Sequence, residues 1–321
     1  MNDCSRVMFA PCLRWISKIV YRFAGPLVVL LWCFSETPHA GDNDKLLIVN
    51  SDLSVQKYAL MQEVFQAHNH YSATVINLAD DSPDKASALI QDRRYQIIYT
   101  IGTKAYLLAR EAAADKNIVF SSVMNWRRLP LTEKSYGIAQ ELPAMMQLMM
   151  FRYLFPDLSK IGVLYSKQFN EEWMSHAENE GREMGVEVIG KDIASSDELI
   201  PRLNELLGEV EALWLIADPM VLANKDSVAQ IFSSSESQKK PVFAYSEIFI
   251  DFGAVLVISA DIPTMSRQAS VLVDSLVHDS PPPRKVDYPA GSHVILNLKK
   301  QKRYPLRLNK EALGSVNQII E

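Results

Sequence analysis

The chain has 321 residues and a net charge of −5, from 33 basic and 38 acidic side chains. This balance excludes a general basic surface for nucleic acid or anionic lipid, and we expect the one basic cluster, at 299–303, to be a solvated surface turn. With 48% apolar residues, the chain is long enough to bury the core of one large or two medium domains.

The first 40 residues have the order of a secretory signal peptide. A basic start precedes an apolar run at 24–34, and a polar stretch then ends at Ala40. The apolar run is shorter than the roughly 20 residues that span a bilayer. We therefore expect cleavage after Ala40 and a periplasmic mature protein, with an uncleaved membrane anchor less favoured. A lipid anchor at Cys33 is also less favoured, because the bulky Trp32 precedes it.

The cysteines support export, because Cys4, Cys12 and Cys33 are the only three in the sequence. A thiol-free body suits an oxidising compartment. It also excludes thiol catalysis and cysteine-ligated metals after residue 33.

Apolar runs of strand length alternate with helix-length segments after the leader. The first strands are predicted at 46–52, 74–78, 96–101, 117–123 and 136–140, and the helices between them at 54–68, 84–94 and 103–114. Further helices are predicted at 143–155, 170–184, 196–207, 221–233 and 263–278, with a terminal helix at 310–320. The strands predicted between them are at 160–165, 186–191, 211–217, 241–245, 253–258 and 294–298. Nearly continuous apolar strands indicate parallel sheets covered on both faces. The fold class is therefore α/β, with two doubly wound lobes.

No catalytic constellation is present in the sequence. The chain has no G-x-S-x-G motif, Walker loop or G-x-G-x-x-G motif. His68 and His70 lack a nearby third metal ligand, and the methionines at 145, 146, 149 and 150 have the spacing of core residues. We therefore expect a binding protein with no enzyme activity, cofactor or metal.

Polar residues gather where the predicted strands end. Ligands of open parallel sheets bind beyond the carboxyl ends of the strands, and two facing lobes would pool these ends in one cleft. The residues expected there are Ser51, Asp52, Gly102, Thr103, Ser121, Ser122, Tyr165, Ser166, Asp218, Tyr245 and Ser246. Thr103 and Ser122 suit a ligand carboxylate, and Asp218 suits an ammonium group or, equally, a helix cap.

Several segments resemble a known family. They include QIIYTIGTKA at 96–105, NIVFSSVMN at 117–125, KIGVLYS at 160–166, ALWLIADPMV at 212–221 and VILNLKKQKRYPLRLNKEAL at 294–313. In this order they resemble the substrate-binding proteins of ABC transporters, a family with aromatic amino-acid binders and a type I periplasmic binding protein fold. The chain departs from the family at Tyr304, where glycine is usual.

The resemblance implies two lobes joined by a multi-strand hinge. It places crossings near 138–142, 248–252 and 282–286, which gives a first lobe of 44–139 plus 251–281 and a second of 140–250 plus 282–321. It also implies delivery of a small molecule, such as an amino acid, to an inner-membrane ABC permease. The alternative is a periplasmic ligand-sensing accessory protein that signals to a membrane partner without transport.

Overall fold

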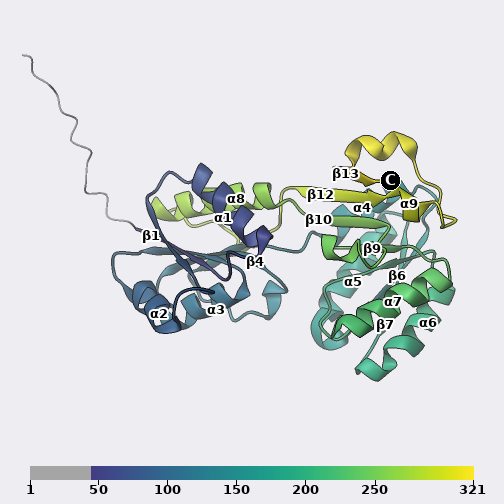
Figure 1. The fold of residues 1–321 in the computed structure, drawn as a ribbon, viewed down its shortest axis with the longest axis horizontal. Coiled ribbons are helices and arrows are strands. Elements are labelled where there is room, and N and C mark those ends of the chain that lie inside the picture. Colours follow the sequence, from purple (N-terminus) through teal and green to yellow (C-terminus); the bar gives the residue numbers. More distant parts are fainter. Residues whose placement is uncertain (1–44) are drawn as a thin grey trace, which may run out of the picture. The chain divides into compact units, whose positions relative to one another are not determined.

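The computed structural model describes residues 45–321 (Figure 1). The predicted signal peptide and its cleavage site lie outside the described residues. Within 45–321, no helix is both long and apolar enough to cross a membrane.

The first sheet contains parallel strands, and the side chains of its four central strands are almost all buried. Its strands are β1 (Leu46–Asn50), β2 (Ala73–Asn77), β3 (Ile97–Ile101), β4 (Asn117–Val123), β5 (Ser135–Ala139) and β11 (Val286–Asp287). The order across the sheet is β11-β5-β4-β3-β1-β2, and every pair is parallel. Strands β1, β3 and β5 are buried along their whole length, as expected for a sheet covered on both faces.

Helices cover the two faces of this sheet, as Figure 1 shows. Helices α2 (Pro83–Gln91) and α3 (Thr103–Ala112) lie on one face, and α1 (Gln56–His68) and α8 (Ile262–Val277) lie on the other. Two serines of α8 donate hydrogen bonds to carbonyl oxygens of α1: Ser266 to Met61 at 2.5 Å and Ser270 to His68 at 3.1 Å. These bonds let two helices far apart in the sequence pack closely without unpaired hydroxyl groups.

The second sheet forms the other lobe. Its strands are β6 (Lys160–Tyr165), β7 (Glu187–Asp192), β8 (Ala212–Trp214), β9 (Val242–Ala244), β10 (Leu256–Ala260), β12 (Ser292–Asn297) and β13 (Gln318–Ile320). The order is β13-β12-β10-β9-β8-β6-β7, with β10 and β12 antiparallel. Helices α4 (Ala144–Leu154) and α5 (Lys167–Glu183) pack together, as do α6 (Leu199–Glu209) and α7 (Lys225–Ser237), and α9 is the short helix Leu298–Gln301. The predicted fold class, with two doubly wound parallel lobes, is confirmed.

The predicted terminal helix at 310–320 is wrong. A short 3-10 helix covers Lys310–Ser315, and the chain then extends as β13, which pairs in parallel with β12. The backbone N–H and C=O groups along the outer edge of β12 would otherwise face solvent unpaired. Pairing with β13 satisfies them, so tertiary contact outweighs the local helical pattern.

The chain passes between the lobes at three places, two of them later than expected. Strand β10 pairs with β9 in the second sheet, and α8 packs on the first, so the second crossing is at Asp261 rather than near 248–252. Strand β11 belongs to the first sheet and β12 to the second, which places the third crossing at 288–291 instead of 282–286. The segment 251–260, expected in the first lobe, thus contributes its strand to the second. The first crossing is the segment 140–143, between β5 and α4.

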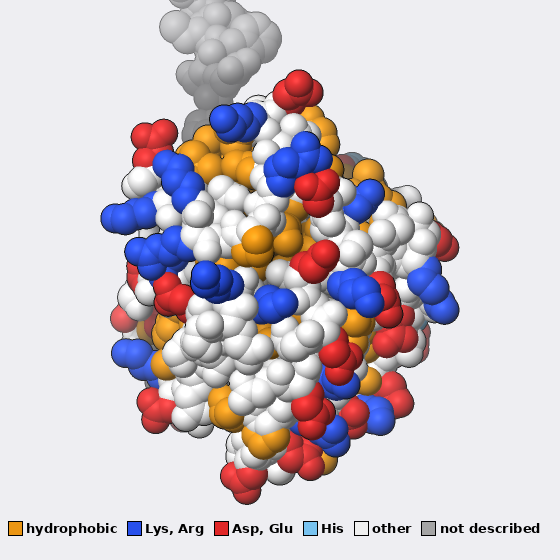
Figure 2. Space-filling view, turned by 90° about the vertical axis from the view of Figure 1, so that its right-hand side faces the viewer, with side chains coloured by type: hydrophobic (Ala, Val, Ile, Leu, Met, Phe, Trp, Pro, Cys, Tyr) orange, Lys and Arg blue, Asp and Glu red, His pale blue; other side chains and the backbone are white. Residues whose placement is uncertain are grey.

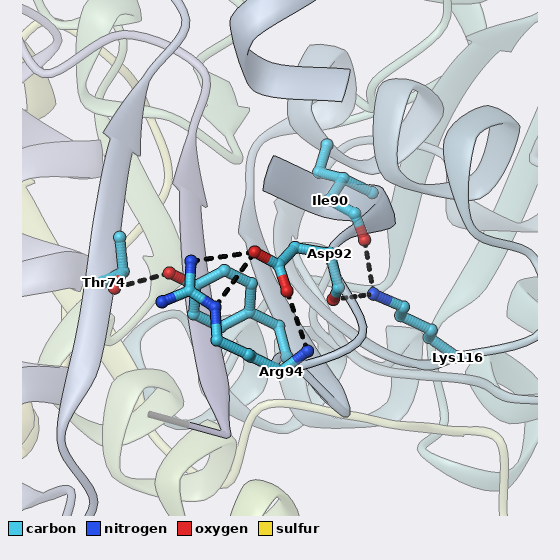
Figure 3. A network of polar contacts seen from close by, with 6 residues as sticks. Thr74, Ile90, Asp92, Arg94 and Lys116 are labelled. Carbon is cyan, nitrogen blue, oxygen red and sulfur yellow. Dashed lines mark hydrogen bonds and ion pairs between the residues drawn. The ribbon is translucent and has the colours of Figure 1, made fainter. Parts of the chain in front are cut away.

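A polar network closes the loop that follows α2 (Figure 3). The Asp92 carboxylate accepts hydrogen bonds from the backbone N–H and the guanidinium of Arg94. The Lys116 ammonium donates to the carbonyl oxygens of Ile90 and Asp92, both at 2.6 Å. The lysine therefore satisfies carbonyls at the end of α2, which have no partner within the helix.

The surface carries charges of both signs. Figure 2 shows one face on which basic and acidic side chains are interspersed. In the basic cluster around α9, Lys300 and Arg303 both pair with Glu236, each at 3.1 Å. These ion pairs are consistent with a solvated surface turn.

Close packing between β4 and β5 leaves no room for a side chain at Gly137. A Cβ atom built there would lie 2.4 Å from the Phe120 ring. We expect Gly137→Ala to lower the free energy of unfolding by about 1–3 kcal/mol, because the ring and strand must move to relieve the overlap. Urea denaturation measures the change.

Gly208, in α6, provides the matched control. A Cβ atom there meets nothing within 4 Å, so Gly208→Ala should leave stability unchanged or raise it by up to about 1 kcal/mol. Equal unfolding midpoints for the Gly137→Ala variant and the unchanged protein would contradict the packing described.

Candidate ligand-binding site

A cleft of about 970 Å³ is lined by residues of both lobes. The first lobe contributes the start of α1 and the loop after β4, and the second contributes the start of α5 and the segments after β8 and β9. Residues of the first crossing, and the residues on either side of the second, also line it. The cleft therefore lies where the carboxyl ends of strands in the two parallel sheets meet, as the sequence predicts.

Three aromatic side chains, Phe169, Trp173 and Tyr245, line the cleft from the second lobe. The ring of Trp173 packs edge-on against buried Trp214, with centroids 5.0 Å apart. Tyr245 packs similarly against Phe249 at 5.4 Å. These contacts hold the aromatic walls in place before a ligand enters.

Arg128 connects the two sides of the cleft. It lies in the loop after β4, and its guanidinium is 4.2 Å from the centroid of Phe169, near the start of α5. Burial lowers the pKa of Arg128 below its ordinary value, and the negative charges of Asp218 and Glu141 oppose this shift. Neighbouring Arg127 is engaged elsewhere, because it donates to the hydroxyl group of Tyr288.

Glu141, at the first crossing, is the most unusual polar residue of the cleft. Its Oε1 accepts a hydrogen bond from the backbone N–H of Asn125, whereas its Oε2 is buried without a partner among residues 45–321. Burial raises the pKa of the carboxyl group, opposed by the Asn125 hydrogen bond and by Arg127 and Arg128. Burial, and secondarily the charge of Glu141, raises the pKa of Tyr245 to about 12.

The structure places two of the predicted site residues, Tyr245 and Ser246, in the lining of the cleft. Both follow β9. The other predicted residues lie at the same edges of the sheets but do not contribute to the lining, and their part in ligand binding stays a prediction.

In the first lobe, several of these residues form hydrogen bonds within the protein. The N–H of Gly102 donates to the carbonyl of Ser121 at 2.9 Å. The Ser51 hydroxyl accepts from the N–H of Ala105 at 3.0 Å, near the start of α3, whose first residue is Thr103. The structure thus brings these residues together, with their polar groups joining β1, β3 and β4. Two more polar groups there have internal partners: the Ser121 hydroxyl bonds to Tyr99, and the Asp52 carboxylate accepts from Ser54.

Ser122 shapes the cleft through its backbone. Its φ of 55° lies in the left-handed region, and the pairing register between β4 and β5 breaks there. The residues that follow, Met124, Asn125, Arg127 and Arg128, line the cleft. The Ser122 hydroxyl is itself buried without a partner among the described residues.

Asp218 is saturated with hydrogen bonds. It is 1% exposed, and its Oδ2 accepts from the N–H and hydroxyl of Ser166 and, at 2.6 Å, from the amide of Asn170. Its Oδ1 accepts from the N–H groups of Met220 and Val221. These contacts join the loops after β6 and β8 and hold the turn at 218–221, whereas Asn224 caps the following helix, α7. Asp218 is therefore not a helix cap, and its contact with a ligand stays a prediction.

Tyr165, the last residue of β6, packs beside β7. A Cβ atom at Gly190 would lie 3.0 Å from its ring. Several lining residues were not predicted to bind ligand: the crossing residues Gln140 and Glu141, the aromatic start of α5, and Met124, Asn125, Arg127 and Arg128 of the loop after β4. The available signal was NWRR at 125–128, directly after a predicted strand.

Comparisons with known proteins agree with this architecture. A ligand-free, open substrate binding protein with adhesive properties from Clostridium difficile has a TM-score of 0.67 and 15% identity, over 86% of this chain and 99% of that one. A domain from Streptococcus pneumonia in complex with L-Trp has a TM-score of 0.59 and 16% identity, over 87% of this chain and all of that one. At these identities the structures show the fold, which is the two-lobed periplasmic binding protein class.

Sequence comparison assigns the family. Residues 57–320 match the family described as ABC transporter substrate binding protein, and the chain belongs to this family. The family consists of substrate-binding proteins rather than enzymes. The tyrosine-binding protein of Clostridioides difficile (strain R20291) is 23% identical over 208 residues, which are 61% of this chain and 59% of that protein. The match thus spans less than two thirds of that relative.

The saturated carboxylate of Asp218 gives a stability prediction. Asp218→Ala leaves several buried donors unpaired, so we expect the free energy of unfolding to fall by at least about 3 kcal/mol. The exposed Asp251 serves as the control, and Asp251→Ala should change stability by less than about 0.5 kcal/mol. Urea denaturation of both variants measures this. Unchanged stability with reduced ligand affinity would instead make Asp218 a ligand contact.

Proposed function

We propose that this protein captures a small amino-acid-like molecule in the periplasm and delivers it to an ABC permease. The observation that carries the proposal is the cleft, because it is lined from both lobes and combines aromatic walls with charges of both signs. Membership of the ABC transporter substrate-binding family supports transport as the purpose of binding.

The chemistry of the cleft suits an aromatic zwitterion. Phe169, Trp173 and Tyr245 offer apolar rings, while Arg128 and Glu141 offer opposite charges for a carboxylate and an ammonium group. A related protein is named for tyrosine binding, and a structural relative contains L-Trp. These relatives support aromatic amino acids as the first ligands to test.

Capture would work by closure of the lobes around the ligand. A ligand that contacts both lobes favours the closed arrangement by its higher affinity for that arrangement. The three crossings at 140–143, 261 and 288–291 are short segments that could act as the hinge. The Arg128–Phe169 contact spans the cleft and would be remade or tightened as the lobes move.

Ligand recovery and closure test this proposal together. Protein purified without denaturation should release an amino acid or similar molecule when it is denatured, and mass spectrometry would identify it. Adding that molecule back should reduce the radius of gyration in small-angle scattering. A saturating ligand that leaves the radius unchanged would contradict closure, and unaltered uptake in cells lacking the protein would favour the sensing alternative.

The compartment is tested separately. We expect the exported protein to begin near Gly41, because the small residue Ala40 ends the leader. N-terminal sequencing of the periplasmic fraction measures this. A product that retains Met1 and remains with the inner membrane would contradict cleavage.

A further inference from the structure

Two neighbouring acceptor atoms at the first crossing lack hydrogen bonds. Gln140 Oε1 and Glu141 Oε2 are both buried without a partner among residues 45–321, and both residues line the cleft. An unpaired buried acceptor is costly, and a carboxylate oxygen is more costly than an amide oxygen. Such a pair is expected where a bound molecule supplies the missing donors.

The Glu141 carboxylate is held in a fixed orientation. Asn125, which has a left-handed φ of 53°, donates its backbone N–H to Oε1. This bond holds Oε1 in place, whereas Oε2 is buried without a donor among residues 45–321. Because β5 ends at Ala139 and α4 begins at Ala144, Glu141 lies in a short connection between two regular elements.

No cation of the described chain neutralises Glu141 by direct contact. Among residues 45–321, no lysine or arginine forms an ion pair with it. The two arginines whose charges act on Glu141 make other contacts, since Arg127 bonds to Tyr288 and Arg128 stacks on Phe169. The protein therefore supplies no donor to Oε2 of Glu141 among residues 45–321.

A protonated amine is the donor that fits. It carries three N–H donors and a positive charge, which match one carboxylate oxygen and one amide oxygen. A metal ion fits poorly, because the described residues hold no group of three or more metal-ligating His, Cys, Asp or Glu side chains.

We propose that Glu141, with Gln140 beside it, binds the protonated amine of the ligand and thereby selects amines over otherwise similar acids. The inference rests on the proposed function and refines it, because it assigns the ammonium contact to Glu141 rather than to Asp218. The two carboxylates differ in their contacts: every oxygen of Asp218 accepts hydrogen bonds from the protein, whereas one oxygen of Glu141 accepts none.

The raised pKa of Glu141 makes binding depend on pH. An ammonium group stabilises the ionised carboxylate, so binding lowers this pKa and releases a proton between the two values. Affinity is then full above the pKa of the free protein and falls as the pH drops below it. The other titratable or charged residues at the cleft are Lys57, Arg127, Arg128, Lys167, Glu171, Glu172, Tyr245 and Glu247.

The test uses three probes and calorimetry. L-tyrosine has both charged groups, tyramine has only the amine, and 3-(4-hydroxyphenyl)propionate has only the carboxylate. In Glu141→Gln, we expect roughly ten- to hundredfold weaker binding of L-tyrosine and tyramine, because a charge-assisted hydrogen bond is lost. Binding of the propionate should be unchanged or tighter. Glu63→Gln, on the exposed side of α1, is the matched control and should bind all three probes like the unchanged protein.

Three results would overturn the inference. They are an unaltered affinity of Glu141→Gln for L-tyrosine, a loss of affinity for the propionate equal to that for the amines, and a failure of the unchanged protein to bind either amine. The proposed function is judged apart from these, by the small molecule recovered from native protein. If Glu141→Gln does not fold in a melting curve, calorimetry of the unchanged protein in two buffers of different ionisation enthalpy replaces it. L-tyrosine binding must then release protons at some pH between the pKa of Glu141 in the complex and its higher pKa in the free protein. The absence of release across the whole pH range in which the protein is folded would refute the role of Glu141.

Discussion

The cleft depends on one constraint, the parallel pairing of strands buried on both faces. When strands run in one direction, each strand-to-helix connection leaves from the same edge of its sheet. In the first sheet this edge carries the loops after β1, β3 and β4, and in the second those after β6, β8 and β9. Side chains from distant parts of the sequence therefore meet at the cleft, whereas the opposite edge is free for structural networks such as that around Asp92 and Lys116.

The segment from Ser122 to Glu141 concentrates the energetic costs of the fold. It contains two non-glycine residues with left-handed backbones, Ser122 and Asn125, and buried unpaired polar atoms on Ser122, Trp126, Gln140 and Glu141. Each such feature costs of order 1–3 kcal/mol. Elsewhere in residues 45–321, unpaired buried polar atoms occur singly, on Asn69, Glu180 and Ser235. A protein retains such a cluster when binding supplies the missing partners, which is the physical basis for placing the ligand here.

The sequence predicted what depends on local pattern and missed what depends on tertiary contact. Strands 117–123 and 160–165 were predicted with their observed bounds, because buried parallel strands are apolar throughout. The segment 310–320 was predicted as a helix, because its pairing with β12 cannot be read locally. Tyr245 was placed in the cleft because it ends the predicted strand at 241–245. Glu141 was missed because its proposed role depends on a hydrogen bond from Asn125 and on the left-handed backbone at Ser122 and Asn125. Asparagine tolerates this conformation, but its presence alone does not predict which side chain the turn will contact.

Asp218 and Glu141 show why charge alone does not identify a binding residue. From sequence, Asp218 is the stronger candidate, because it directly follows the predicted apolar strand at 211–217 and precedes a proline. In the structure, donors from two loops surround it, and its charge is spread over five hydrogen bonds within the protein. Glu141 receives one backbone donor, and its other oxygen is buried without a partner among residues 45–321. A carboxylate that accepts few hydrogen bonds from the protein gains more from an incoming cation than one that accepts many. On this ground Glu141 has a greater capacity than Asp218 to bind an ammonium group.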